Sequence, residues 1–412
     1  MRSTVPRRRP CQEPSWPRQV SVAVEPQWLA ERRRKGAALA SELDLPTAKD
    51  KGWEFTDLSG LDLDSHAPAG GTVTGVSQGT DSDDGPPVVM PLEEAARQLS
   101  DIVRERFGSV VPVSDPFVAR NEANWRNGAL VYVPRGTRLE HPLELSVVHD
   151  GDGSGLDWRT LIVLEEGADA EVWERYGSAS DDGEGLFNGV VELWVGPGAN
   201  LRYVCEQELS DRTWVFATQR AELERDASLE WVALGFGSAR GKVRMETKLG
   251  GPGSSAKVTG AYAGAGRQHL DFDTTQEHAA AHTTSDLAFR GVLADRATAV
   301  WRGMIRVDPG AQQTDAFQES RNLLLSKNAH ADAIPGLEIE ANDVRCTHAA
   351  AVAQVDPEQL YYLRSRGMSE PQAKRLIIDG FLQELAERTA EGPLREALSE
   401  ALNRRLAEIL AD

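Results

Sequence analysis

The central part of the chain, from about Ala129 to Val352, alternates short apolar and polar positions between turns rich in Gly, Pro and Asp. Alternation over four to eight residues is typical of β-strands with one buried face. The clearest predicted strands are Ala129–Val133, Leu143–Val148, Thr160–Leu164, Val190–Val195, Leu201–Val204, Ser228–Leu234 and Ala299–Val307. Their near-regular spacing predicts an all-β unit.

A small residue that follows a turn and precedes a strand recurs within this unit. Five such anchors are Ala199, Ala227, Ser255, Ala297 and Ala311. The differences in residue number between successive anchors along the chain are all multiples of one common number. The separation of Ala168 from Ala199 is not such a multiple and breaks the series. A turn at a fixed phase is what stacked coils require, because each coil buries its inward side chains against the next. The pattern favours a β-helix and leaves a large sandwich or barrel open as the alternative.

Helical spacing replaces this alternation on the N-terminal side. Apolar residues three and four apart predict helices over Pro26–Leu43 and Leu92–Phe107. Residues 65–87 hold few large apolar groups and predict a mobile loop. Residues 1–25 are rich in Pro and Arg and predict a disordered basic tail.

The end of the chain predicts three further helices. Asp356 suits an N-cap and Pro357 a first helical position. Ser369 begins a second helix, and leucines four apart predict a third over Leu394–Leu410.

These patterns divide the chain into four parts. We expect a disordered tail over 1–25, an N-terminal helical region over 26–120, a β-helix core over 121–355 and a C-terminal helical region over 356–412.

Composition narrows the classes of function. The formal net charge of −19 argues against binding the phosphate backbone of nucleic acids. No apolar run approaches the roughly 20 residues that span a bilayer. Arg7–Arg9 precede Pro10 and Cys11 rather than an apolar segment, so a secretory signal is not expected. We therefore expect a cytoplasmic protein that binds neither nucleic acid nor membrane.

The cysteines predict no disulfide framework. Cys11, Cys205 and Cys346 are odd in number and far apart, which suits reduced thiols. No CxxC pair is present, so this chain alone cannot build a four-cysteine zinc or iron–sulfur site.

The segment that most resembles a phosphate-binding loop is Gly235–Val243. A P-loop requires Gly where Phe236 stands, and a hydroxyl residue where Val243 stands. We expect this chain to bind no nucleotide itself.

A second segment, His269–His282, is rich in metal-ligand residue types. His278 and His282 would share one face of a helix, but the metalloprotease pattern lacks its Glu, because Ala279 follows the first His. The surroundings predict strands, where residues four apart lie about 13 Å from one another. We favour structural roles on coil surfaces or at turns.

The segment Ala341–Val352 contains Cys346 and His348, two residues apart. On an extended strand they would point to the same side, and thiolate with imidazole is a ligand set for iron, zinc or copper. Two ligands leave a coordination sphere incomplete, so a second chain would have to supply the rest. A buried structural cysteine and a nucleophilic Cys–His pair are the alternatives.

Several blocks in order resemble the SufB/SufD family of iron–sulfur cluster assembly proteins. The blocks are His269–Thr275, Thr283–Leu293, Gly303–Ser326, Pro335–Val352 and Leu360–Met368, with Leu45–Leu58 similar to a SufD-type signature. The modest length and few cysteines also favour the SufD type.

The resemblance implies a right-handed parallel β-helix between helical regions, without catalytic activity of its own. It implies a scaffold subunit of the SUF complex that pairs with a SufB-like paralogue through the β-helix. It further implies that a SufC-like ABC ATPase binds the C-terminal helices. A transient Fe–S cluster would form at the paralogue interface, with His348 as a ligand and Cys346 as a helper.

The sequence departs from the family pattern directly after His348. The family often has Gly and then Ala-Thr there, whereas this chain has Ala349, Ala350 and Ala351. A different class also stays open, a stand-alone β-helix enzyme acting on sugars or esters. Such an enzyme would need paired carboxylates. Asp271 and Asp273 share one face of a strand, but we expect them to lie at a turn or in contact with solvent.

Overall fold

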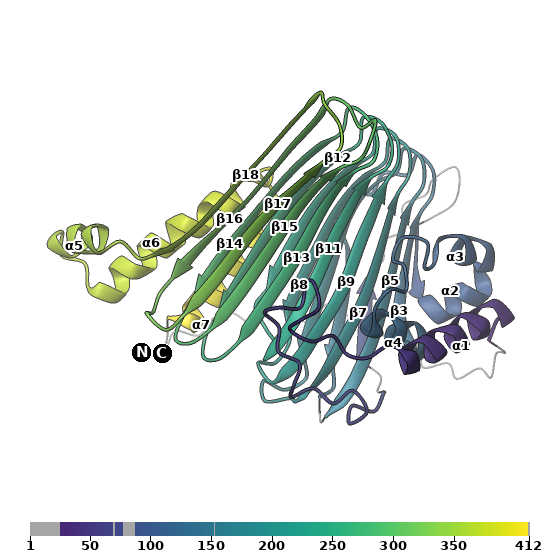
Figure 1. The fold of residues 1–412 in the computed structure, drawn as a ribbon, viewed down its shortest axis with the longest axis horizontal. Coiled ribbons are helices and arrows are strands. Elements are labelled where there is room, and N and C mark those ends of the chain that lie inside the picture. The colour runs from purple at the N-terminus through teal and green to yellow at the C-terminus, as the bar shows by residue number, and fades with distance from the viewer. Residues whose placement is uncertain (1–24, 69–70, 77–86, 152, 411–412) are drawn as a thin grey trace.

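The structure, a computed structural model, describes residues 25–68, 71–76, 87–151 and 153–410. The predicted basic tail over 1–25 therefore lies outside the described residues except for Glu25. Within the described residues, the strands wind into two stacked nine-stranded sheets that face each other (Figure 1). The predicted mainly β, parallel β-helix fold is confirmed, and the sandwich and barrel alternatives are excluded by the parallel pairing of successive coils.

Each coil gives one strand to each sheet. The first sheet runs, in spatial order, β1 (Gly71–Val76), β4 (Leu143–His149), β6 (Asp169–Ser178), β8 (Asn200–Glu208), β10 (Ser228–Gly235), β12 (Ser255–Gly264), β14 (Thr284–Leu293), β16 (Thr314–Leu324) and β18 (Val344–Gln354). The second runs β17 (His330–Ile339), β15 (Thr298–Val307), β13 (His269–His278), β11 (Arg240–Leu249), β9 (Thr213–Leu223), β7 (Gly185–Val195), β5 (Ser154–Leu164), β3 (Asn127–Val133) and β2 (Val88–Pro91). Only β1 with β4 and β2 with β3 pair antiparallel among these strands.

The register shows why the predicted repeat was only partly right. One residue of each first-sheet strand from β6 to β18 pairs in register with the equivalent residue of a neighbouring coil: Asp169, Asn200, Ser228, Ser255, Thr284, Asp315 and Arg345. The separations of these residues along the chain vary from coil to coil. Ala168 and Ala199 each directly precede a position of this set, so Ala168 belongs to the series that it seemed to break. Ser255 is displaced by one position, and Ala297 lies at the opposite corner before β15. Loop lengths differ between coils, so no fixed period exists.

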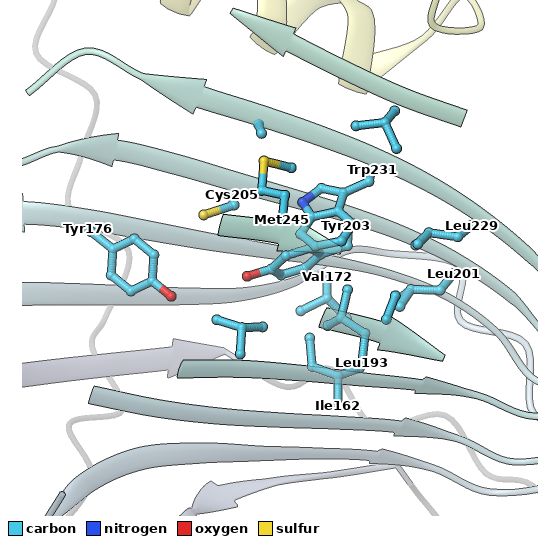
Figure 2. Packing of buried hydrophobic residues seen from close by; sticks show 14 of the residues in the cluster. Ile162, Val172, Tyr176, Leu193, Leu201, Tyr203, Cys205, Leu229, Trp231 and Met245 are labelled. Carbon is cyan, nitrogen blue, oxygen red and sulfur yellow. The ribbon is translucent and has the colours of Figure 1, made fainter. Parts of the chain in front are cut away.

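Side chains that point inward from both sheets fill the space between them, which we call the lumen. Figure 2 shows aliphatic and aromatic residues of successive coils stacked there, including Leu201, Tyr203, Leu229 and Trp231. Tyr203 and Trp231 have no exposed surface, and their rings meet edge to face with centroids 5.7 Å apart. Each coil therefore depends on its neighbours to bury its core.

Helices α1 (Gln27–Glu42), α2 (Leu92–Gln98), α3 (Ser100–Arg106) and α4 (Pro116–Asn124) gather at the end of the stack that holds β3 and β5 (Figure 1). The first confirms the helix predicted over Pro26–Leu43. The single helix predicted over Leu92–Phe107 is wrong, because Leu99 has a non-helical φ of −116° and divides it. The mobile loop predicted over 65–87 is wrong for Gly71–Val76, which forms β1. Residues 69–70 and 77–86 of that segment lie outside the described residues.

Helices α5 (Pro357–Ser365), α6 (Glu370–Ala386) and α7 (Pro393–Ile409) follow β18. The Asp356 side chain accepts from the Glu358 N–H, as expected of the predicted N-cap, and Ser369 forms a capping box with Gln372 at the predicted start of the second helix. Apolar residues of α6 and α7, among them Ile378 and Leu402, pack against the outer face of the first sheet. In contrast, α5 has no buried residue and projects away from both sheets (Figure 1). No helix of the described residues is long and apolar enough to cross a membrane.

Candidate functional site at the open end of the β-helix

The last coil leaves its core uncovered. Strands β17 and β18 each pair on one side only, and we call these two strands the rim. Leu337 and Ile339 on β17 expose 38% and 42% of their surface, whereas their register partners one coil below, Ile305 and Val307, are fully buried. Val352 on β18 is 43% exposed. Inward-facing positions that are sealed elsewhere in the stack are therefore open to solvent at the rim.

The two rim strands differ in how well their edges are protected. Pro335 lies within β17, where it offers no N–H, and Glu338 adds a charge. Strand β18 carries three consecutive alanines, Ala349–Ala351, and no proline. An exposed edge of that kind is a template for another strand.

The structure places Cys346 and His348 on β18. Cys346 is half-buried and packs against a small apolar cluster that includes Ile305 and Ala316. Burial, with a smaller effect from the charge of Asp315, raises the pKa of the Cys346 thiol. The thiol is therefore a poor ligand until a cation or a new environment lowers its pKa. His348, two residues further along the strand, is exposed.

The rim offers few ligands from this chain alone. Within the described residues, no group of three or more His, Cys, Asp or Glu side chains could hold a metal ion. One imidazole and one thiol can supply two ligands at most, and tetrahedral iron or zinc takes four.

The other cysteines do not extend this site. Cys205 lies in the lumen, where burial raises the pKa of its thiol to about 12, so it stays protonated (Figure 2). Cys11 lies outside the described residues.

The segment His269–His282 has structural roles. His278 points into the lumen, where its ring nitrogens lie 2.7 Å from Thr283 Oγ1 and 2.8 Å from Ser285 Oγ. Burial lowers the pKa of His278 to about 4, so the ring is neutral at neutral pH. His282 is exposed at the following turn. A structural role was predicted, but the position of His278 inside the lumen was not.

The prediction that Asp271 is a turn or solvent residue is wrong. Asp271 is 3% exposed, and its two carboxylate oxygens accept from Lys242 Nζ at 2.9 Å and from Thr56 Oγ1 at 2.5 Å. Asp273 lies 3.6 Å from the same Lys242 nitrogen. Trp53, from the same N-terminal segment as Thr56, is buried beside them with Phe117 and other apolar residues. Asp271 thus ties the N-terminal segment to the second sheet through Thr56, and Lys242 joins Asp271 to Asp273.

Sequence patterns gave little warning of this contact, because it joins two parts of the chain that are far apart in sequence. The one signal was the similarity of Leu45–Leu58 to a SufD-type signature, which contains Trp53 and Thr56.

A second exposed surface lies on α5 and α6. Tyr361 and Tyr362 on α5 expose 76% and 56% of their surface, and Leu376 on α6 exposes 50%. Tyr362 and Leu376 line a shallow groove between the two helices, together with Leu363 and Ile377. Aromatic and aliphatic side chains so exposed are typical of protein–protein contacts.

The fold and its rim define a class of protein: a parallel β-helix whose last coil is left uncovered, with ligand-type side chains on its final strand. Residues 147–381 match the family model described as the SUF system FeS cluster assembly SufBD core domain. The chain belongs to this family.

Individual relatives support the assignment. The chain is 29% identical to the iron–sulfur cluster assembly protein SufD of Bacillus subtilis, over 91% of this chain and 93% of that protein. It is 30% identical to SufB of the same organism, over 76% of this chain and 66% of that protein. It is also 29% identical to a SufBD family protein of Mycobacterium tuberculosis, over 90% of this chain and 93% of that protein. The match to SufD thus covers more of both chains than the match to SufB.

Proposed function

We propose that this chain is a non-catalytic, SufD-type scaffold subunit of the SUF machinery, which pairs with a SufB-like paralogue and a SufC-like ABC ATPase in the cytoplasm. The observation that carries the proposal is the rim, where lumen-facing positions and an unprotected strand edge are left open. Family membership supplies the chemistry, iron–sulfur cluster assembly. The better coverage of SufD than of SufB supports the SufD type.

The partner at the rim would be a second β-helix. A strand added to β18 would satisfy its free backbone groups, and the lumen of the partner would cover Leu337, Ile339 and Val352. The small side chains of Ala349–Ala351 allow a partner backbone to approach closely.

The nascent cluster would lie at this junction. His348 is the ligand that we assign to this chain, because its side chain is exposed and imidazole is a suitable ligand for iron. Cys346 has a secondary, helper role, because it packs into the apolar cluster and its thiol pKa is raised. The partner would supply the remaining ligands, and the cluster is cargo that the complex builds and transfers.

The ATPase would bind the C-terminal helical region, residues 356–412. We assign the contact to α5 and the adjoining face of α6, because their apolar side chains are exposed while those of α7 are used against the first sheet. Residues 26–120 and 121–355 would be the N-terminal helical region and the β-helix core of this scaffold.

The test is His348→Ala in the complex purified from cells. We expect the three proteins to co-purify as before, because the side chain is exposed, and we expect the iron and acid-labile sulfide per complex to fall several-fold. Thr347→Ala, on the opposite face of the same strand, is the matched control. Iron and sulfide at the wild-type level in His348→Ala would remove His348 from the ligands.

A further inference from the structure

A fully buried glutamine lies next to His348 on the neighbouring strand. Gln318 on β16 is the register partner of His348 on β18, and its relative exposure is 0%. Neighbouring strands lie about 4.8 Å apart, and side chains in register share a face. Cys346 packs against inward-facing Ala316, its own register partner, so this face is the lumen face. Gln318 and His348 are therefore stacked on the lumen side of the last two coils.

The amide of Gln318 is oriented by its hydrogen bonds. Its Nε2 donates to the carbonyl oxygens of Gly303 at 3.2 Å and Gly336 at 3.1 Å. Both acceptors belong to the second sheet, so the side chain crosses the lumen. A carbonyl oxygen cannot donate, and therefore the nitrogen of the amide must face these two atoms. The oxygen, Oε1, is left as a buried acceptor without a hydrogen-bond partner among the described residues.

The space that holds this amide is kept open by a glycine. A Cβ added to Gly303 would lie 2.5 Å from Gln318 Oε1 and even closer to the Trp301 ring. Buried polar atoms usually have partners, and the strand that carries this unpartnered acceptor is the direct neighbour of the rim strand β18. The imidazole N–H of His348 is the donor in register with it.

We propose that Gln318 is a positioning residue for His348. When a partner covers the rim, the His348 ring turns into the lumen and donates one N–H to Gln318 Oε1. That bond selects one tautomer and leaves the other ring nitrogen, with its lone pair, facing the junction. Metal-binding histidines commonly donate their second N–H in this way. This inference rests on the proposed ligand role of His348.

Two substitutions separate positioning from structure. The Met side chain in Gln318→Met has a similar length but no acceptor oxygen. The Glu side chain in Gln318→Glu keeps an acceptor oxygen, but when ionised it cannot donate to Gly303 and Gly336. Neither Met nor an ionised Glu can donate to Gly303 and Gly336, so a purely structural role predicts at least as much damage from Gln318→Glu as from Gln318→Met. The control is Gln276→Met on β13, because Gln276 is also buried, faces the lumen and has an unpartnered Oε1.

The first measurement is iron bound by the three-protein complex. We expect roughly 10- to 100-fold weaker iron retention in Gln318→Met, as is typical when the partner of a ligating histidine is removed. We expect most of the loss to be recovered in Gln318→Glu and no change in Gln276→Met. Equal losses in the Met and Glu variants, or none in Gln318→Met, would overturn the inference.

The second measurement does not depend on iron. With ¹⁵N-histidine in this chain alone, solid-state NMR of the sedimented complex reports the His348 tautomer, and His348→Ala identifies its signals. We expect one neutral tautomer in the wild type and a mixture in Gln318→Met. A mixture in the wild type would overturn the inference even if Gln318→Met failed to fold. Normal iron in His348→Ala would instead overturn the ligand role, whichever tautomer is found.

Discussion

Replacing Lys242 with Met should loosen the N-terminal segment from the second sheet. The Lys242 ammonium and the Asp271 carboxylate are 2.9 Å apart, and their side chains are only 4% and 2% exposed. Thr56 donates to the same carboxylate, so the pair connects strands β11 and β13 to the segment that contains Trp53. Methionine keeps most of the volume of the lysine side chain and removes only its charge and donors.

The magnitude follows from burial. Removing one partner of a buried ion pair leaves the other charge uncompensated and typically costs about 3–5 kcal/mol. Replacing both partners costs much less, so Lys242→Met with Asp271→Asn should recover most of this loss. Lys248→Met is the matched control on the same strand. Its partner Glu222 lies 2.7 Å away, but both side chains are about one-quarter to one-third exposed, and such pairs contribute about 1 kcal/mol or less.

Hydrogen exchange read by mass spectrometry is the suitable assay, because a stack of coils can open in parts and a single unfolding midpoint is then ill defined. A loss of about 3 kcal/mol corresponds to exchange that is roughly 100-fold faster, given about 1.36 kcal/mol per tenfold. We expect this acceleration in peptides covering residues 45–66 and β13. Equal exchange rates in Lys242→Met and Lys248→Met would refute the reasoning. A double variant that exchanges as fast as Lys242→Met would refute it as well.

Two further predictions concern α5 and the lumen. The double variant Tyr361→Ala/Tyr362→Ala should keep the melting temperature of the wild type, because both side chains are exposed. It should weaken ATPase binding by roughly 30-fold or more, as loss of interface tyrosines often does. Calorimetry measures the affinity, with Asn403→Ala on α7 as the control, and equal affinity of the double variant and the control would show that the assignment is wrong. The pKa of His278 is about 4 in the folded chain, below its ordinary value of 6.5. Its contribution to stability is therefore complete above about pH 6.5 and is lost as the pH falls toward 4, by up to about 3 kcal/mol. His278→Gln should flatten the dependence of unfolding free energy on pH in that window, and an unchanged slope would contradict the assignment.

Local patterns predicted the β-helix because apolar alternation marks part of many strands and turn residues separate them, although the strands are longer than predicted, as Ser154–Leu164 shows against Thr160–Leu164. They failed where distant parts of the chain decide the outcome. No residue near Leu99 indicates that the predicted helix divides there. A residue distant in sequence contacts this point, because Trp28 Nε1 donates to Ser100 Oγ at 3.2 Å. Gly71–Val76 holds few large apolar residues and forms a strand only because β4 offers an edge.

The candidate site was predicted in part for a similar reason. Cys346 and His348 could be named from their spacing and from the family resemblance, since both signals are local. Gln318 could not, because its importance depends on the register between strands of successive coils and on the carbonyls of two distant glycines. The sequence showed the apolar faces of α6 and α7. It did not show that the outer face of the first sheet covers them.

The most direct test of the rim as a junction is amide exchange along β18, Val344–Gln354, in the free chain and in the complex with its SufB-like partner. We expect the amides that point to the free edge to exchange quickly in the isolated chain, and to slow at least 100-fold when the partner adds a strand. Exchange along β18 that is the same with and without the bound partner would contradict the account.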